Sequence, residues 1–188
     1  MLNKTALILI VIGLVIIGYA SLQRMTGHQS EKAALARIKK ELEEREATEI
    51  KLAELSFQHG QTIGVLEIPA INKELPIVEG TDEEALKHGV GHFTNTVYPG
   101  EKDQILLSGH RDTVFTGLDN LQNGDTIIVK MAHGTFTYSI TGTEIVDEDD
   151  TTIIRSTAPE EILTLSTCYP FTYIGNAPQR YIVYAERD

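Results

Sequence analysis

The sequence predicts a mainly β domain, a closed barrel or a sandwich, carried on an amino-terminal membrane helix and a charged helical stalk. Residues 5–23 contain no charged side chain, and residues 31–54 are highly charged and contain neither Gly nor Pro. From Ile63 onward the chain consists of short β-like runs separated by Gly, Pro, Asn and Asp. A length of 188 residues allows one or two domains, and 41% apolar residues are enough for a buried core.

The charge of the chain is unevenly distributed. It has 27 acidic and 16 basic side chains, a net charge of −11. The first 54 residues hold 8 basic and 7 acidic side chains, whereas the rest holds 8 basic and 20 acidic ones. The acidic excess therefore lies in the β-rich part and argues against a nucleic-acid-binding surface, which needs a basic stripe.

Residues 1–23 are predicted to be a membrane anchor. The 19 uncharged residues would span about 28 Å as a helix, close to the roughly 30 Å of a hydrocarbon core. A cleavable signal peptide is the alternative, because Gly18 and Ala20 have the spacing for cleavage after Ala20. The apolar run is long for a signal peptide and a stalk follows it, so we favour an uncleaved anchor. Lys4 favours an amino terminus inside the cell, but Arg24 and Lys32 soon follow the run, so the charges alone leave the orientation open.

Residues 24–59 are predicted to form a helical stalk or linker. Several oppositely charged side chains lie four residues apart, a spacing that supports a solvated helix. Leu35, Ile38 and Leu42 begin a heptad that Arg45 does not continue. A spacer is therefore expected rather than a coiled coil.

Residues 60–188 are predicted to form the folded domain. We expect a helix at 82–89 with Thr81 as its N-cap, and a second short turn near 114–121. The expected strands are residues 63–71, 74–80, 103–111, 125–132, 134–146, 160–168 and 179–186. Seven or eight short strands joined by turns are typical of a barrel or sandwich.

Cys168 is the only cysteine. A single cysteine excludes an intrachain disulfide and a Cys-rich zinc site. It ends the predicted strand at 160–168, which would place its side chain at the rim of a barrel, where a substrate can reach it. Two interpretations remain open at this point: a buried inert thiol, and a nucleophile.

A cysteine nucleophile needs a proton acceptor and a group that stabilises the oxyanion. Of the six histidines, His110 alone follows an apolar β-like run, residues 105–109, whereas His92 at a helix-to-strand junction is a weaker candidate. Arg180 opens the last strand and is the candidate for stabilising the oxyanion. The alternative is an ordinary charged residue at the edge of a sheet. Three strand ends thus offer a thiol, an imidazole and a guanidinium.

Three motifs resemble those of a known family. SGHRD at 108–112, TLSTC at 164–168 and PQRYIVYA at 178–185 resemble the His, Cys and Arg motifs of the sortases, the cysteine transpeptidases of Gram-positive cell surfaces. TLSTCYPF followed by IGNAPQRYI is most similar to the class D branch. The resemblance covers roughly residues 60–188 and implies an eight-stranded sortase β-barrel with one or two short helices.

The resemblance also implies a reaction and a location. The Cys168 thiolate would attack the carbonyl after Thr in an LPxTG-like sorting signal, and an amine of a lipid-linked peptidoglycan precursor would resolve the thioester. His110 would act as proton donor and acceptor, and Arg180 would stabilise the oxyanion or orient the substrate. The domain would lie on the extracellular face of the membrane of a Gram-positive bacterium, and no cofactor is expected.

Substrate binding is expected from the loops that flank Cys168, residues 147–160 and 169–178. Packing of the barrel rim is the alternative role for their apolar side chains. The residues expected to contribute to substrate binding are Thr167, Pro159, Tyr169, Phe171, Tyr173, Ile174 and His92. The acidic run at 147–150 lacks the spacing of a dedicated calcium loop, so we expect a solvated turn and no metal, with a calcium site as the less favoured alternative.

Two other classes of cysteine enzyme fit the sequence poorly. A papain-like peptidase is disfavoured because its Cys precedes its His, whereas His110 precedes Cys168 by 58 residues. The Ser-His-Gly-Cys motif of an L,D-transpeptidase is absent. The remaining alternative is a non-catalytic, membrane-anchored β-domain that binds wall polymer or protein.

Overall fold

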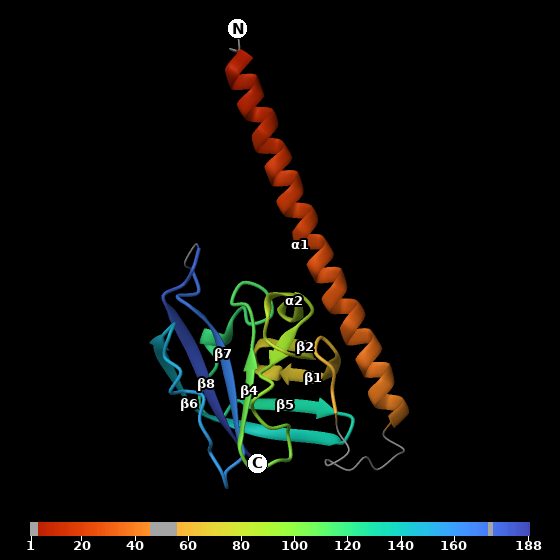
Figure 1. Cartoon of the computed structure of the whole chain (residues 1–188), viewed down its shortest axis with the longest axis vertical. Helices are drawn as coiled ribbons and strands as arrows, with labels where there is room; N and C mark the ends of the chain where they lie inside the picture. Colours follow the sequence, from red (N-terminus) through yellow and green to blue (C-terminus); the bar gives the residue numbers. More distant parts are fainter. Residues whose placement is uncertain (1–3, 46–55, 173–174) are drawn as a thin grey trace.

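The computed structural model describes residues 4–45, 56–172 and 175–188 (Figure 1). One long helix, α1 (Lys4–Arg45), precedes a closed barrel of eight strands. The prediction of a mainly β, eight-stranded barrel with few helices is confirmed. The helix runs through residue 23, the expected boundary between anchor and stalk, since no proline interrupts the chain there.

The barrel closes in the order β1-β2-β3-β4-β7-β8-β6-β5. Neighbouring strands are antiparallel except for two parallel pairs, β2 with β3 and β4 with β7. The strands are β1 (Thr62–Ile68), β2 (Lys73–Glu79), β3 (Val90–His92), β4 (Gln104–Ser108), β5 (Thr126–Met131), β6 (Gly134–Asp147), β7 (Ile162–Tyr169) and β8 (Gln179–Arg187).

Seven strands were expected within a few residues of these bounds, and β3 was missed. β3 has only three residues, Val90–His92, too few to show a period of two. The strand expected at 63–71 ends earlier, because Pro69 begins the 3-10 helix η2 (Pro69–Ile71). The parallel pair of β2 and β3 is joined by the segment that contains α2.

The helix expected at 82–89 is shorter than predicted. α2 (Glu83–Leu86) has Asp82, not Thr81, as its N-cap. The Asp82 carboxylate accepts hydrogen bonds from the backbone N–H groups of Glu84 and Ala85, at 3.0 and 3.3 Å. The carboxylate caps the helix because it accepts from two of the free N–H groups of the first turn. A further 3-10 helix, η3 (Leu118–Asn120), lies in the expected turn region.

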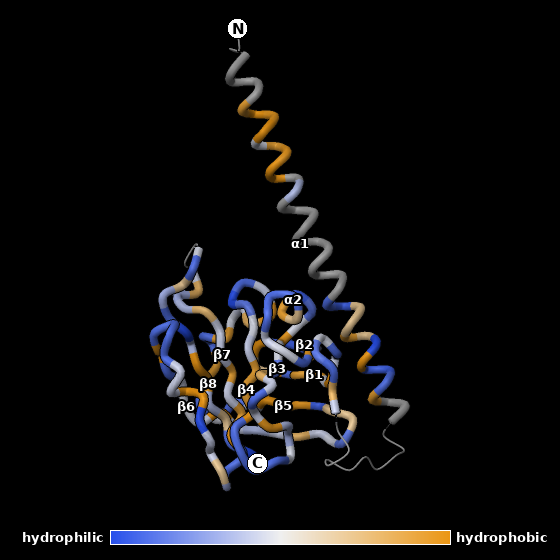
Figure 2. Tube along the Cα trace, viewed as in Figure 1, coloured by the Kyte–Doolittle hydropathy of each residue, from blue (hydrophilic) through white to orange (hydrophobic). Residues whose placement is uncertain are grey.

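The apolar side chains of the barrel are buried in its interior, whereas those in the amino-terminal half of α1 are exposed. The largest fully buried side chains include Leu66, Ile105, Phe115, Tyr138 and Leu163. Figure 2 shows that most of the coloured residues in the amino-terminal half of α1, away from the barrel, are hydrophobic. Among the residues that the structure describes, no helix is apolar over a stretch long enough to cross a membrane.

Candidate active site

The pairing of three adjacent strands brings the predicted catalytic residues together. Cys168 on β7 lies directly opposite Arg180 on β8. Ser108, the last residue of β4, lies opposite Ser166 on β7, so the chain leaving β4 reaches His110 beside Cys168. Residues that lie opposite one another in a ladder have side chains on the same face of the sheet, so the thiol and the guanidinium share a face.

A pocket lies at this edge of the barrel. Its volume is about 470 Å³, and His110, Cys168 and Arg180 all line it. Arg111, Asp112, Glu148 and residues 175–177 complete its wall. The structure thus places a half-buried thiol, an imidazole and a guanidinium around one cavity.

The backbone that precedes His110 is fixed to β7. The Gly109 N–H donates a hydrogen bond to the Ser166 carbonyl at 3.1 Å, and the Thr167 hydroxyl donates one to the Gly109 carbonyl at 2.7 Å. On the other side, the His110 carbonyl accepts a hydrogen bond from the Phe115 N–H at 3.0 Å. The backbone segment that carries the His110 imidazole is therefore held by hydrogen bonds on both sides.

The Arg180 guanidinium is held from two directions. Its Nη1 donates hydrogen bonds to the carbonyls of Ala177 and Gln179, at 3.1 and 3.0 Å. Its Nη2 lies 3.7 Å from Oε2 of Glu148, whose own backbone N–H donates to the Pro178 carbonyl. Glu148 is not among the residues predicted from the sequence, because the whole acidic run at 147–150 was expected to be a solvated turn.

Two aromatic residues expected to bind substrate pack together on the other face. Thr167 and Tyr181 lie opposite each other and belong to the face that alternates with Cys168 and Arg180. The Tyr169 ring stacks on Tyr181 with centroids 6.1 Å apart, and the Phe171 ring meets Tyr181 edge-on at 5.4 Å. Tyr169 and Phe171 thus have the alternative role, packing of the barrel rim, and do not line the Cys168 pocket.

The remaining predictions for substrate binding have different outcomes. The Thr167 hydroxyl is buried and bonded to Gly109, so it acts on the backbone. Pro159 is exposed and precedes β7, whose eight residues put roughly 25 Å between its two ends. Pro159 does not line the Cys168 pocket, because its segment is held where β7 begins, beside Asp103, which accepts a hydrogen bond from the Thr157 N–H at 2.6 Å. The predictions for Tyr173 and Ile174 lie outside the described residues.

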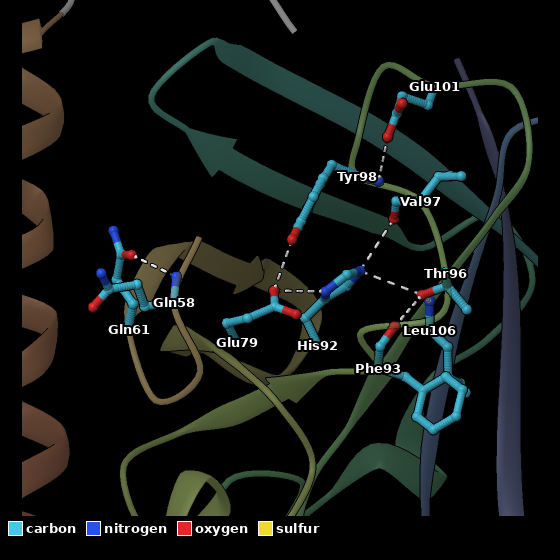
Figure 3. Close-up of polar contacts among 10 residues, drawn as sticks. All are labelled: Gln58, Gln61, Glu79, His92, Phe93, Thr96, Val97, Tyr98, Glu101 and Leu106. Atoms are coloured by element: carbon cyan, nitrogen blue, oxygen red, sulfur yellow. Dashed lines mark hydrogen bonds and ion pairs between the residues drawn. The ribbon is translucent and has the colours of Figure 1, made fainter. Parts of the chain in front are cut away.

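His92 lies in a buried cluster and not in the pocket (Figure 3). Its side chain is 1% exposed, and its Nδ1 lies 2.9 Å from Oε2 of Glu79. Its Nε2 donates to the Val97 carbonyl at 3.1 Å, and the Tyr98 hydroxyl donates to the same Glu79 oxygen at 3.1 Å. A side chain this buried cannot contact a substrate, so the assignment of His92 to substrate binding is corrected to a structural role.

The same cluster perturbs two ionisable groups. Burial alone would raise the pKa of Glu79, but hydrogen bonding to His92 and the charge of His92 outweigh it, and the pKa is lowered. Burial and the neighbouring Glu79 carboxylate raise the pKa of Tyr98. The carboxylate is thus stabilised in its charged form inside the barrel wall.

The acidic run serves local structure in one clear instance. The Asp150 carboxylate accepts hydrogen bonds from the backbone N–H and the hydroxyl of Thr152, at 2.8 and 2.6 Å, and these bonds lower its pKa. Within residues 4–45, 56–172 and 175–188, no group of three or more His, Cys, Asp or Glu side chains is placed to hold a metal ion.

Comparison with known proteins decides the family. A family model described as the sortase domain matches residues 66–188. The chain belongs to the sortase family. Sortases are cysteine transpeptidases, so this sortase is an enzyme, and the alternative of a non-catalytic wall-binding domain is set aside.

Relatives and solved structures place this sortase nearest class D. It is 47% identical to Sortase D of Bacillus subtilis over 190 residues, covering 96% of both chains. It is 27% identical to Sortase A of Bacillus anthracis, over 95% of this chain and 90% of the relative. It also resembles the structure of a Sortase D5 transpeptidase from Clostridium perfringens, with a TM-score of 0.72 and 28% identity, over 85% of this sortase and 99% of that chain.

Proposed function

We propose that this sortase cleaves an LPxTG-like sorting signal after its Thr and transfers the protein to an amine of a lipid-linked cell-wall precursor. The observation that carries the proposal is the shared pocket of His110, Cys168 and Arg180. Such a reaction needs a nucleophile, a proton carrier and a cation for the oxyanion. The three strand ends supply one group of each kind.

In the first half of the reaction, the Cys168 thiolate attacks the carbonyl carbon of the Thr in the sorting signal. The carbonyl oxygen becomes an oxyanion, which the Arg180 guanidinium stabilises without changing its own protonation state. His110 then donates a proton to the leaving amine, the C–N bond breaks, and a thioester remains.

In the second half, the acceptor amine attacks the thioester. His110 takes a proton from that amine, the C–S bond breaks, and the Cys168 thiolate is restored with the imidazolium. Each turnover therefore breaks one amide and forms another, and no water or cofactor is consumed.

We also propose that α1 anchors this sortase in the cell membrane, with the barrel on the extracellular side. The support is the run of uncharged residues 5–23 together with the exposure of its described side chains. Leu9, Leu14, Val15 and Ile17 are each 63–69% exposed, and Leu9–Tyr19 contains further exposed aliphatic residues. A continuous exposed apolar surface of this kind is typical of a membrane contact.

The catalytic proposal is tested by mass spectrometry of the full chain with a panel of LPxTG-type peptides. The expected result is an acyl adduct on Cys168 that a peptide amine removes as the transpeptidation product. Cys168→Ala should form neither the adduct nor the product and should unfold at the same temperature. Glu83→Gln, an exposed change on α2, is the matched control and should retain both. Full activity of the Cys168→Ala variant would contradict the proposal.

A further inference from the structure

The carboxyl-terminal part of α1 has a specific contact with the barrel. Ile38 lies on a highly charged stretch of the helix, yet it is only 5% exposed. Its neighbour Lys39 forms an ion pair with Glu74 of β2. Residues 33–41 of α1 also share the wall of a cavity with residues 60–62 at the start of β1. This part of the stalk is therefore docked on the barrel and is not a free spacer.

The docking site lies on the side of the barrel opposite the thiol. In the closed ring of eight strands, β1 is four places from β7, and β2 is four places from β8. Cys168 and Arg180 belong to β7 and β8. The helix thus packs on the side of the barrel away from the pocket and does not cover it.

The docked helix also sets the direction in which the pocket faces. Arg180, the second residue of β8, lines the pocket. β8 ends beside the carboxyl terminus, which lies at the end of the barrel away from the amino-terminal half of α1 (Figure 1). The pocket end of the barrel therefore faces the uncharged half of the helix. From Ile38 to Gln23 the helix rises about 22 Å, and the nine residues of β8 span roughly 30 Å. The two lengths are comparable, and Gln23 is the last residue of the uncharged segment that the pocket end faces.

We infer that residues 33–41 of α1 are a strut that holds the Cys168 pocket toward the membrane surface, where it receives an amine carried on a lipid. The inference rests on the proposed anchor and transpeptidation. A rigid connection keeps the pocket at the height of a lipid headgroup, whereas an undocked barrel would sample many orientations. The docking therefore raises the effective concentration of a lipid-linked acceptor at the thioester.

The orientation can be measured without catalysis. The full chain with Cys168→Ala is placed in vesicles that carry a nitroxide on a lipid headgroup, with a fluorophore on Asn176→Cys at the pocket or on Asp188→Cys at the carboxyl terminus. We expect stronger quenching at position 176, and a loss of that difference when Ile38→Asp is added. Ala36→Asp, an exposed change on the same helix, should keep the difference. Equal quenching at both positions, or failure of the parent chain to bind vesicles, overturns the inference.

The consequence for the reaction is measured with two acceptors in the same vesicles. One is free triglycine, and the other is glycine linked to the headgroup of phosphatidylethanolamine. Ile38→Asp should lower transfer to the lipid-linked glycine about tenfold and leave transfer to triglycine unchanged. The strut is overturned if Ile38→Asp transfers to each acceptor as fast as the parent does. It is also overturned if the variant slows transfer to both acceptors equally. A parent chain that transfers to neither acceptor contradicts the proposed function instead, and the quenching difference then decides the orientation on its own.

Discussion

The Thr167 hydroxyl donates a buried hydrogen bond of 2.7 Å to the Gly109 carbonyl. Gly109 is the residue before His110, and Thr167 is the residue before Cys168. The Gly109 N–H is also occupied, by the Ser166 carbonyl at 3.1 Å. The N–H and the carbonyl of Gly109 thus hold the end of β4 on β7. The two predicted catalytic residues, His110 and Cys168, each follow directly after this contact.

Replacing Thr167 with Val should lower activity while the fold survives. Valine has nearly the same shape but no hydroxyl, so the buried Gly109 carbonyl loses this donor at a cost of about 1–3 kcal/mol. We expect slower thioester formation and a lower melting temperature. Thr167→Ser keeps the donor and is the matched control, which should restore most of both. The measurement is the single-turnover rate together with thermal unfolding, and a Val variant as fast as the parent would contradict this role.

Gly109 should not tolerate a methyl group. A Cβ at this position would lie 2.6 Å from Cγ2 of Val114 and 2.8 Å from the Phe115 ring. Both side chains are buried, so the end of β4 must shift and carry His110 with it. Gly109→Ala is expected to cost about 1–3 kcal/mol of folding stability and to slow acylation.

Gly142 provides the control for this substitution. A Cβ at Gly142 on β6 meets no atom of the described residues within 4 Å. Gly142→Ala should therefore leave acylation unchanged in the same assay. Equal acylation rates of the two variants would show that the close packing around Gly109 does not position His110.

Glu148→Gln should affect catalysis more than stability. The Glu148–Arg180 ion pair is partly exposed, with side chains 54% and 30% accessible, and such pairs contribute little to folding. Loss of the carboxylate nevertheless frees Nη2 of Arg180 from one of its contacts. We expect kcat to fall about twofold, corresponding to about 0.5 kcal/mol, with an unchanged melting temperature. Asp149→Asn, the next exposed acidic residue, should leave kcat unaltered, and an unaltered kcat in Glu148→Gln would remove Glu148 from the positioning of Arg180.

The sequence predicts which residues lie at the rim of the barrel, but it does not predict the contacts that surround them. A polar residue or a thiol at either end of an apolar run marks the rim of a barrel, and this pattern predicts His110, Cys168 and Arg180 as rim residues. The pairing of β4 with β7 joins residues nearly 60 positions apart, so the contact of Thr167 with Gly109 has no local signature. Alternation within β7 does separate Tyr169 from Cys168 onto opposite faces, and applying it to the rim would have excluded Tyr169 from the pocket.

His92 and the docked stalk show what periodicity cannot detect. β3 is too short to show which face His92 occupies, and its partner Glu79 lies on a different strand. Ile38 is one of three large aliphatic residues, with Leu35 and Leu42, in the charged part of the helix, and its burial depends on the position of the barrel. Both features depend on tertiary contacts, which no window of the sequence contains.

The buried pair of Glu79 and His92 should make folding stability depend on pH. The pKa of Glu79 is lowered in the folded state, so its contribution is present above the ordinary value of 4.5 and is lost as the pH falls through the folded pKa. Glu79→Gln removes the charge and leaves His92 in a buried site without its carboxylate. We expect a loss of about 3 kcal/mol at pH 7, measured by urea unfolding of the full chain.

This difference should shrink on acidification, because protonation of Glu79 in the parent removes the same charge that the variant lacks. Urea unfolding at pH 7 and at pH values below the ordinary glutamate range should therefore give converging free energies for the two proteins. Glu83→Gln, exposed on α2, should differ little from the parent at either pH. A Glu79→Gln penalty that is equally large in acid would show that the cluster stabilises the barrel through packing and hydrogen bonding, not through the charge on Glu79.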